Sequence, residues 1–336
     1  MKKIITLSML FMATVLFAQE ETPKLSVSGS VDAYYQTNLT ASDNAGATYG
    51  TAFAGQTGFA VGMGNIIFSY EGAKTGVVLD LVTGPRGAGA TFSNDIVDGI
   101  VNQAYVYWNV SEGTTLTMGR FNTFLGYEVI APAANFNYST SYLFSSGPFS
   151  HVGLKADFAL SDDWSLMLAI TNPWDTNDTS ATGEYALGAQ LGYSGQFLNL
   201  YYDSGNAGGL GFEIDYTGGF DLSDSFFLGL NAAYNDNDGS GFYGAALYPQ
   251  IATSDSFSIG LRGEYFGLHG DGDDLPSVLA TTLTGSYTVE NLIIKPEIRL
   301  DALSNADGGL LGSFVDSDGL PTDSLAAFTL AAIFTF

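Results

Sequence analysis

The chain has 336 residues, of which 35 are acidic and 10 basic, giving a formal net charge of −25. This acidity argues against nucleic acid or an anionic lipid surface as a partner. A hydrophobic content of 46% excludes a disordered acidic chain, and the lack of cysteine excludes disulfides, thiolate metal sites and a lipoprotein anchor. Only 13% of the residues are charged, about half the usual share for a soluble domain, and 42 are glycine.

The first twenty residues indicate export from the cytoplasm. Lys2 and Lys3 precede an apolar run over residues 4–17, which is followed by Ala18 and Gln19. This pattern is typical of a signal peptide, and the run is too short to span a bilayer. We expect cleavage after Ala18, which leaves residues 19–336 as one domain. No later apolar run is long enough for a membrane-spanning helix.

The remaining chain alternates apolar and polar residues over segments of about ten residues, as transmembrane β-strands do. Residues 25–36 and 99–110 show the alternation, and residues 292–302 show it most clearly. In that last segment one face is apolar, and the opposite face carries Lys295, Glu297, Arg299 and Asp301 in succession. Such a face does not suit a dry protein core and needs water. We expect a β-bulge at Pro296, because proline removes a ladder donor.

The connections between these segments alternate in length. Short turns near 71–74, 111–113, 161–163, 194–195, 221–224, 253–255 and 289–291 separate longer loops near 39–57, 85–98, 122–148, 173–182, 204–208, 236–240, 269–276 and 303–322. Short periplasmic turns and long extracellular loops are typical of outer-membrane barrels. The sequence predicts an all-β fold, one antiparallel up-and-down barrel of about 16 strands, with 14 or 18 as alternatives.

Both ends of the chain fit this architecture. An even strand number places the N- and C-termini together in the periplasm. The final strand alternates as well and ends in Phe336. A terminal strand that ends in phenylalanine resembles the signal that outer-membrane barrels present to their assembly machinery. The alternative is the last strand of a soluble sheet.

One connection, residues 122–148, is unlike the others in length and composition. It has about 27 residues where loops usually have about 4–6, and it is rich in aromatic residues that are costly to leave in water. We expect it to fold into the barrel and narrow the pore. The candidate constriction residues are Arg120, Glu128, Asn135, Asn137, Tyr138 and Tyr142.

Within this set, Arg120 and Glu128 are expected to form a charged pair across the narrowest point. Tyr138 and Tyr142 are expected to offer stacking surfaces for a sugar-like solute. The alternation places Arg120 on the outward face unless Gly119 introduces a bulge. Alternatively, the loop only caps the barrel or contacts a neighbouring subunit.

The same alternation assigns charged residues to the lumen, where acids outnumber bases. This excess predicts a preference for cations. The candidate lumen-facing charges are Lys155, Asp157, Glu213, Asp215, Arg262, Glu264, Lys295, Glu297, Arg299 and Asp301.

Other chemistry has little support. The two histidines, His151 and His269, show no arrangement with a nucleophile and an orienting group, so an outer-membrane hydrolase is disfavoured. No spacing suits zinc, and no cofactor is expected. Three acidic, glycine-containing loops near Asp236, Asp273 and Asp316 have oxygen ligands that suit calcium, but each lacks the distal glutamate of a known calcium loop.

Several motifs give the chain a family resemblance. They are Asp32-Ala33-Tyr34-Tyr35, Gly119-Arg120-Phe121, Gly126-Tyr127-Glu128, the run from Asn135 to Phe144, Gly147-Pro148 before His151-Val152-Gly153, and Asn172-Pro173-Trp174-Asp175. Together they resemble the OmpL-like β-barrel porins. The resemblance implies a porin and names no solute.

The sequence therefore predicts an integral porin in the outer membrane of a Gram-negative bacterium. It would admit small hydrophilic solutes, such as sugars or cations, by passive diffusion, and a homotrimer is an open alternative to a monomer. The first rival is a surface barrel that binds a ligand or adheres, with its lumen plugged by the long loop. The second rival is the outer-membrane hydrolase.

Overall fold

The computed structural model describes residues 23–91, 98–176, 183–205, 209–272, 275–304 and 311–336. The expected signal peptide, residues 1–18, lies outside the described residues. Within the described ranges, no helix is long and apolar enough to cross a membrane.

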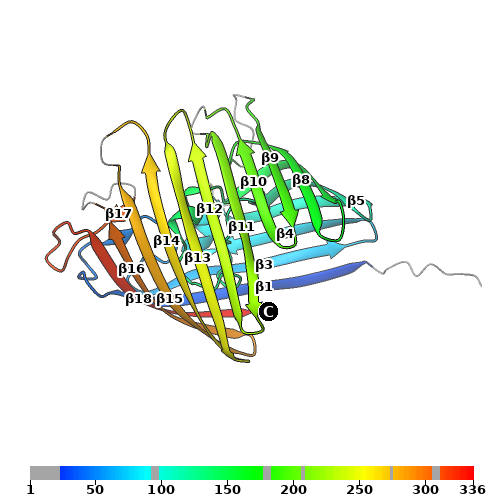
Figure 1. Ribbon diagram of the computed structural model, residues 1–336. Coiled ribbons are helices and arrows are strands. Elements are labelled where there is room, and N and C mark those ends of the chain that lie inside the picture. The colour runs from blue at the N-terminus through cyan, green and yellow to red at the C-terminus, as the bar shows by residue number, and fades with distance from the viewer. Residues whose placement is uncertain (1–22, 92–97, 177–182, 206–208, 273–274, 305–310) are drawn as a thin grey trace, which may run out of the picture.

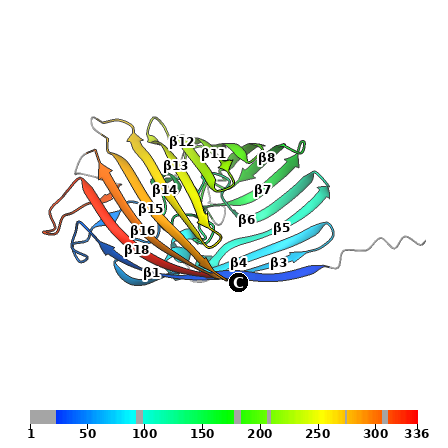
Figure 2. The same ribbon diagram turned by 60° about the horizontal axis from the view of Figure 1, so that its bottom comes forward.

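Sixteen antiparallel strands close into one barrel, in which β1 (Lys24–Asn38) pairs with β18 (Ser324–Thr335) (Figures 1 and 2). The predicted strand number of about 16 is confirmed. Closure leaves no unpaired edge, which the apolar interior of a bilayer demands. The strands between are β3 (Gly58–Glu71), β4 (Thr75–Thr83), β5 (Val101–Ser111), β6 (Thr114–Asn122), β7 (Ser150–Ala159), β8 (Trp164–Thr171), β9 (Ala186–Tyr193), β10 (Gln196–Tyr202), β11 (Phe212–Ser223), β12 (Phe226–Asp236), β13 (Gly241–Ser254), β14 (Phe257–His269), β15 (Ser277–Val289) and β16 (Leu292–Leu303).

The connections contain the remaining elements. A two-stranded sheet joins β2 (Thr48–Tyr49) to β17 (Gly312–Ser313), and the short helices are α1 (Gly84–Thr91), η1 (Asp98–Ile100) and α2 (Tyr142–Ser146). Part of the loop predicted near 85–98 is helical instead, because α1 extends to Thr91. Its glycine-rich sequence has low helix propensity, so packing of the buried Ala90 in a cluster with Met63 and Val82 stabilises it.

The side chains of β16 alternate in burial along the strand. Ile298 and Leu300 are about half exposed on the outer face. Arg299 and Asp301, which alternate with them along the strand, are buried. The expected bulge at Pro296 is wrong, because the pairing of β16 with β15 and with β18 keeps one register across this residue. Proline removes one donor, and the ladders on both sides hold the strand in place.

This outward face gives a stability prediction. Ile298→Arg should lower the free energy of unfolding by about 2–4 kcal/mol, because it places a cation in the middle of the lipid-facing band. Val289→Arg, at the β15–β16 turn, should cost less than about 1 kcal/mol. Urea unfolding in lipid vesicles measures both. An equal cost for the two variants would contradict a lipid-facing β16.

Candidate functional site

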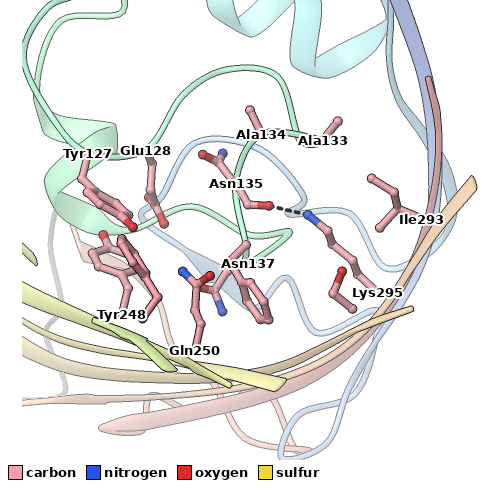
Figure 3. Close-up of a pocket in the computed structure, with 13 residues that line it drawn as sticks. Tyr127, Glu128, Ala133, Ala134, Asn135, Asn137, Tyr248, Gln250, Ile293 and Lys295 are labelled. Carbon is pink, nitrogen blue, oxygen red and sulfur yellow. Dashed lines mark hydrogen bonds between the residues drawn. The ribbon is translucent and has the colours of Figure 1, made fainter. Parts of the chain in front are cut away.

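The connection between β6 and β7 runs through the interior of the barrel. Tyr138, Thr140, Ser141 and Tyr142 belong to this connection, yet they are at most 1% exposed. Figure 3 shows part of the loop facing side chains of the wall strands. Burial of this degree in a connection requires partners for its backbone groups, and the wall strands supply them.

The inward charges of β16 bind the loop one after another. Lys295 Nζ donates to the carbonyls of Pro132, at 2.9 Å, and of Asn135. Glu297 accepts from Tyr138 N at 2.7 Å and Ser139 N at 3.1 Å. Further along, Arg299 Nη1 donates to Thr140 O at 3.0 Å, and Asp301 accepts from the Tyr142 hydroxyl at 2.8 Å. The loop therefore runs beside β16 in the same direction as the strand.

Strand β14 supplies a second set of contacts. Arg262 Nη1 lies 2.7 Å from Glu128 Oε1 and also donates to Ser139 O at 2.6 Å. Glu264 accepts from the backbone N–H groups of Tyr142 and Leu143, at 3.0 and 2.8 Å. Arg262 and Glu128 are both buried, so their ion pair is shielded from water, and its loss would leave a buried charge.

Tyr138 connects the loop to the first strand of the barrel. Its hydroxyl donates to Asp32 Oδ2 at 2.5 Å, and Arg86 of α1 donates to its carbonyl at 2.8 Å. The Arg86 guanidinium also lies 5.0 Å from the centre of the Tyr138 ring. Burial and the neighbouring Asp32 carboxylate raise the pKa of Tyr138, so its hydroxyl keeps the proton that it donates.

Two carboxylates fix the ends of the loop. Near its start, Gly126 N donates to Asp215 Oδ1 at 3.0 Å. At its end, the N–H groups of Phe149 and Ser150 both donate to Asp175 Oδ1 at 2.8 Å. Burial raises the pKa of Asp175 to about 6, although these two N–H groups act in the opposite direction.

Inward-facing glycines make room for the rings of the loop. At three positions on the wall, a Cβ atom would overlap an aromatic ring of the loop. Glycine lets each ring lie directly on the strand backbone, which explains how so bulky a loop fits beside the wall. The pairs are Phe124 over Gly188, Tyr127 over Gly229 and Phe136 over Gly260.

Strand β14 offers a matched test of this packing. Gly260→Val should destabilise the barrel by about 1–3 kcal/mol, because the new side chain displaces the Phe136 ring. Gly263→Val, on the same strand, meets open space and should have little effect. Equilibrium unfolding in urea compares the two variants. If both had the same free energy of unfolding, the packing of the Phe136 ring would not require glycine at position 260.

The expected pair between Arg120 and Glu128 is not formed. Glu128 pairs with Arg262 instead, and Arg120 donates to the carbonyls of Ala90 and Thr91 at the end of α1. The alternation placed Arg120 outward, but its side chain is buried against α1. Gly119 has a φ of 134°, a conformation open to glycine, and the register of β6 shows no bulge there.

Tyr138 and Tyr142 do not offer the expected stacking surfaces, because both rings are covered. Asn135 binds within the loop, with its amide exchanging two hydrogen bonds with Val129. Asn137 Nδ2 donates to Thr284 on β15 at 2.7 Å. The tyrosines thus hold the loop, and Asn137 borders the cavity shown in Figure 3.

The remaining candidate charges fall into two groups. Lys155 and Asp157 on β7 form a 2.6 Å ion pair, and their side chains are 24% and 41% exposed to solvent. Glu213 and Asp215 on β11 are buried, like the charges of β14 and β16. The charges of β11, β14 and β16 are therefore covered, whereas the charged pair of β7 is partly open to solvent.

The histidines and acidic loops have local roles. His151 is fully buried, with Nε2 3.0 Å from the Thr123 hydroxyl, and His269 lies 2.7 Å from the Asn235 carbonyl. Asp316 and Asp236 accept N–H groups of their own turns, and Asp273 lies outside the described residues. Among the described residues, no three His, Asp or Glu side chains converge as a metal site.

A closed 16-stranded barrel with an apolar outer face and a long loop inside a polar lumen defines the porin class of outer-membrane β-barrels. The family model described as "Putative beta-barrel porin-2, OmpL-like" matches residues 24–336. The chain belongs to this family, which confirms the resemblance in its motifs. The comparison with curated proteins found no match.

Solved structures of an outer-membrane protein and of two porins share the fold. A variant of the outer-membrane protein OmpT of Vibrio cholerae that lacks loop L8 has a TM-score of 0.59 at 10% identity, over 94% of this chain and 99% of that chain. The anion-selective porin from Comamonas acidovorans has a TM-score of 0.58 at 10% identity, covering 94% and 100%. A mutant of the Rh. blastica porin has a TM-score of 0.57 at 16% identity, covering 93% and 100%.

The structure adds residues that the sequence did not single out. Arg86 on α1 and Tyr248 on β13 both contact the loop, and Gln250 and Phe227 border the cavity beside it. The alternation of β13 would have placed Tyr248 and Gln250 inward. No signal marked Arg86, because its segment resembles a solvated loop.

Proposed function

We propose that this protein is a porin through which small hydrophilic solutes diffuse passively, in the outer membrane of a Gram-negative bacterium. The observation that carries the proposal is the arrangement of the interior. The loop is bound to β14 and β16, whereas the Lys155–Asp157 pair on β7 remains accessible to solvent. The solute path follows the β7 side of the lumen, where width and charge select what passes.

The charge of the interior supports a preference for cations. The buried charged side chains among the described residues comprise nine acids and five bases. An excess of carboxylates in a low-dielectric channel attracts cations. The likeness to an anion-selective porin lies in the fold alone, at 10% identity.

Planar-bilayer recording tests both parts of this proposal. The purified barrel should give stepwise single-channel currents, and its reversal potential in a dilute KCl gradient should indicate cation selectivity. The selectivity should weaken towards 1 M salt, where the Debye length falls to about 3 Å. A conducting but anion-selective barrel would contradict the cation preference, and a barrel without conductance would contradict the porin function.

A surface barrel with a plugged lumen is the second candidate function. The burial of Tyr138, Thr140 and Tyr142 in the middle of the barrel favours it. Such a barrel would insert into bilayers without conducting ions. The same recordings therefore separate the two candidates.

The orientation in the membrane follows from the lengths of the connections. β1 begins and β18 ends on the side of the short turns, which outer-membrane barrels expose to the periplasm. Both termini are then periplasmic, and Phe336 is available to the assembly machinery on that side.

A further inference from the structure

A cavity of about 420 Å³ lies between the loop and the barrel wall. Its wall residues include Phe227, Gln250 and Ser286, which lie near the short-turn ends of β12, β13 and β15. In Figure 3, Tyr127 and Tyr248 border one side of the space, and Lys295 and Ile293 border the other. The size suits a small ligand, since ligand sites are about 300–1,000 Å³.

The charged groups of this cavity are already paired within the protein. Glu128 uses one oxygen for Arg262 and the other for Ser141 N, at 2.7 and 2.6 Å. Lys295 donates to Pro132 O and Asn135 O. A charged ligand would have to compete with these bonds, so the cavity does not favour an anion or a cation.

Neutral groups remain for a ligand. Within the described part of the chain, Asn137 Oδ1 and the Ser286 hydroxyl make no hydrogen bond, and the Gln250 amide lines the same cavity as Tyr127. These groups can accept or donate to hydroxyls. Gln250 and Ser286 are half-buried and therefore reachable, and the buried Asn137 lines the same cavity.

Aromatic rings supply the rest of the surface. Tyr127 stacks on the buried Tyr248 with ring centres 4.3 Å apart, and the half-buried rings of Phe136 and Phe227 also border the space. The Tyr127 and Phe136 rings are fixed over wall glycines, so they form a rigid platform. A ligand with C–H faces and hydroxyl edges fits such a lining, and a sugar has both.

We propose that this cavity is a binding subsite for neutral sugars, reached from the side of the short turns. Only a role of the subsite in solute passage would rest on the proposed porin function. Binding itself requires just the folded barrel.

Binding of glucose and sucrose to the detergent-solubilised full-length barrel tests the subsite, with calorimetry or saturation-transfer NMR as the measurement. Both sugars should bind saturably. Gln250→Leu, which removes the amide, and Phe227→Leu, which removes a ring face, should each raise the dissociation constant about fivefold. Tyr105→Leu, on the inward face of β5 and outside the cavity, is the matched control and should bind as the wild type does.

Gluconate tests the ligand class, because it is similar to glucose in size and carries a carboxylate. It should bind more weakly than glucose, since Lys295 is already paired. Gluconate binding as tight as glucose, no saturable binding, or equal binding by the Gln250 and Phe227 variants would each overturn the subsite. A conducting barrel without sugar binding overturns the subsite alone, and sugar binding without conductance overturns the porin function alone.

Discussion

Deletion of residues 131–141 should raise the single-channel conductance of the barrel several-fold. This segment holds the backbone groups that bind Lys295, Glu297 and Arg299, so its removal exposes the charged wall of β16 to channel water. A barrel of about 16 strands is wide enough for an aqueous channel when nothing fills it. Planar-bilayer recording of the refolded deletion variant measures the change.

The control for this deletion is a shorter cut in another loop. Residues 317–319 form an exposed turn, and their removal should leave the conductance unchanged. Both variants should still migrate differently before and after boiling in SDS, which reports a closed barrel. Unchanged conductance in a folded 131–141 deletion would show that the loop does not limit the flow of ions.

Arg262→Ala should lower the free energy of unfolding by about 3–5 kcal/mol. The guanidinium is fully buried and binds Glu128 and Ser139, so its loss leaves a buried carboxylate and a carbonyl without their donor. Urea unfolding in lipid vesicles measures the loss. The conductance of this variant should also become noisier, because the loop loses one of its contacts with β14.

Lys155→Ala is the matched control for Arg262→Ala. Its ion pair with Asp157 has a similar separation but is partly exposed, and such pairs contribute about 0–1 kcal/mol. A loss below about 1 kcal/mol in both variants would mean that the Arg262–Glu128 pair adds no more stability than a surface pair.

The alternation of side chains predicts the barrel well but says little about what its inner face contacts. In β16 the four residues that it predicts inside, Lys295, Glu297, Arg299 and Asp301, are buried. Their partners are loop residues about 160 positions away, and a local period contains no information about such distant pairs. Lys295, Glu297 and Arg299 are bound to backbone groups of the loop, and Asp301 is bound to the Tyr142 hydroxyl.

The errors near the loop have a similar cause. Arg120 departs from the strand alternation at Gly119, where the backbone conformation is open only to glycine. Its partners lie on α1, a helix that packing stabilises and local propensity does not predict. The sequence predicts Tyr138 and Tyr142 as stacking surfaces for a sugar-like solute, but their hydroxyls bind Asp32 and Asp301.

The contacts of Tyr138 also bear on the order in which the barrel assembles. Its hydroxyl binds Asp32 on β1, and its backbone N–H binds Glu297 on β16, so one loop residue bridges strands on both sides of β18. The seam between β1 and β18 joins the first and last strands, which meet only after the whole chain has been synthesised. A loop from mid-chain thus bonds one strand on each side of β18, and both bonds can be made together only once β1 and β16 flank that strand.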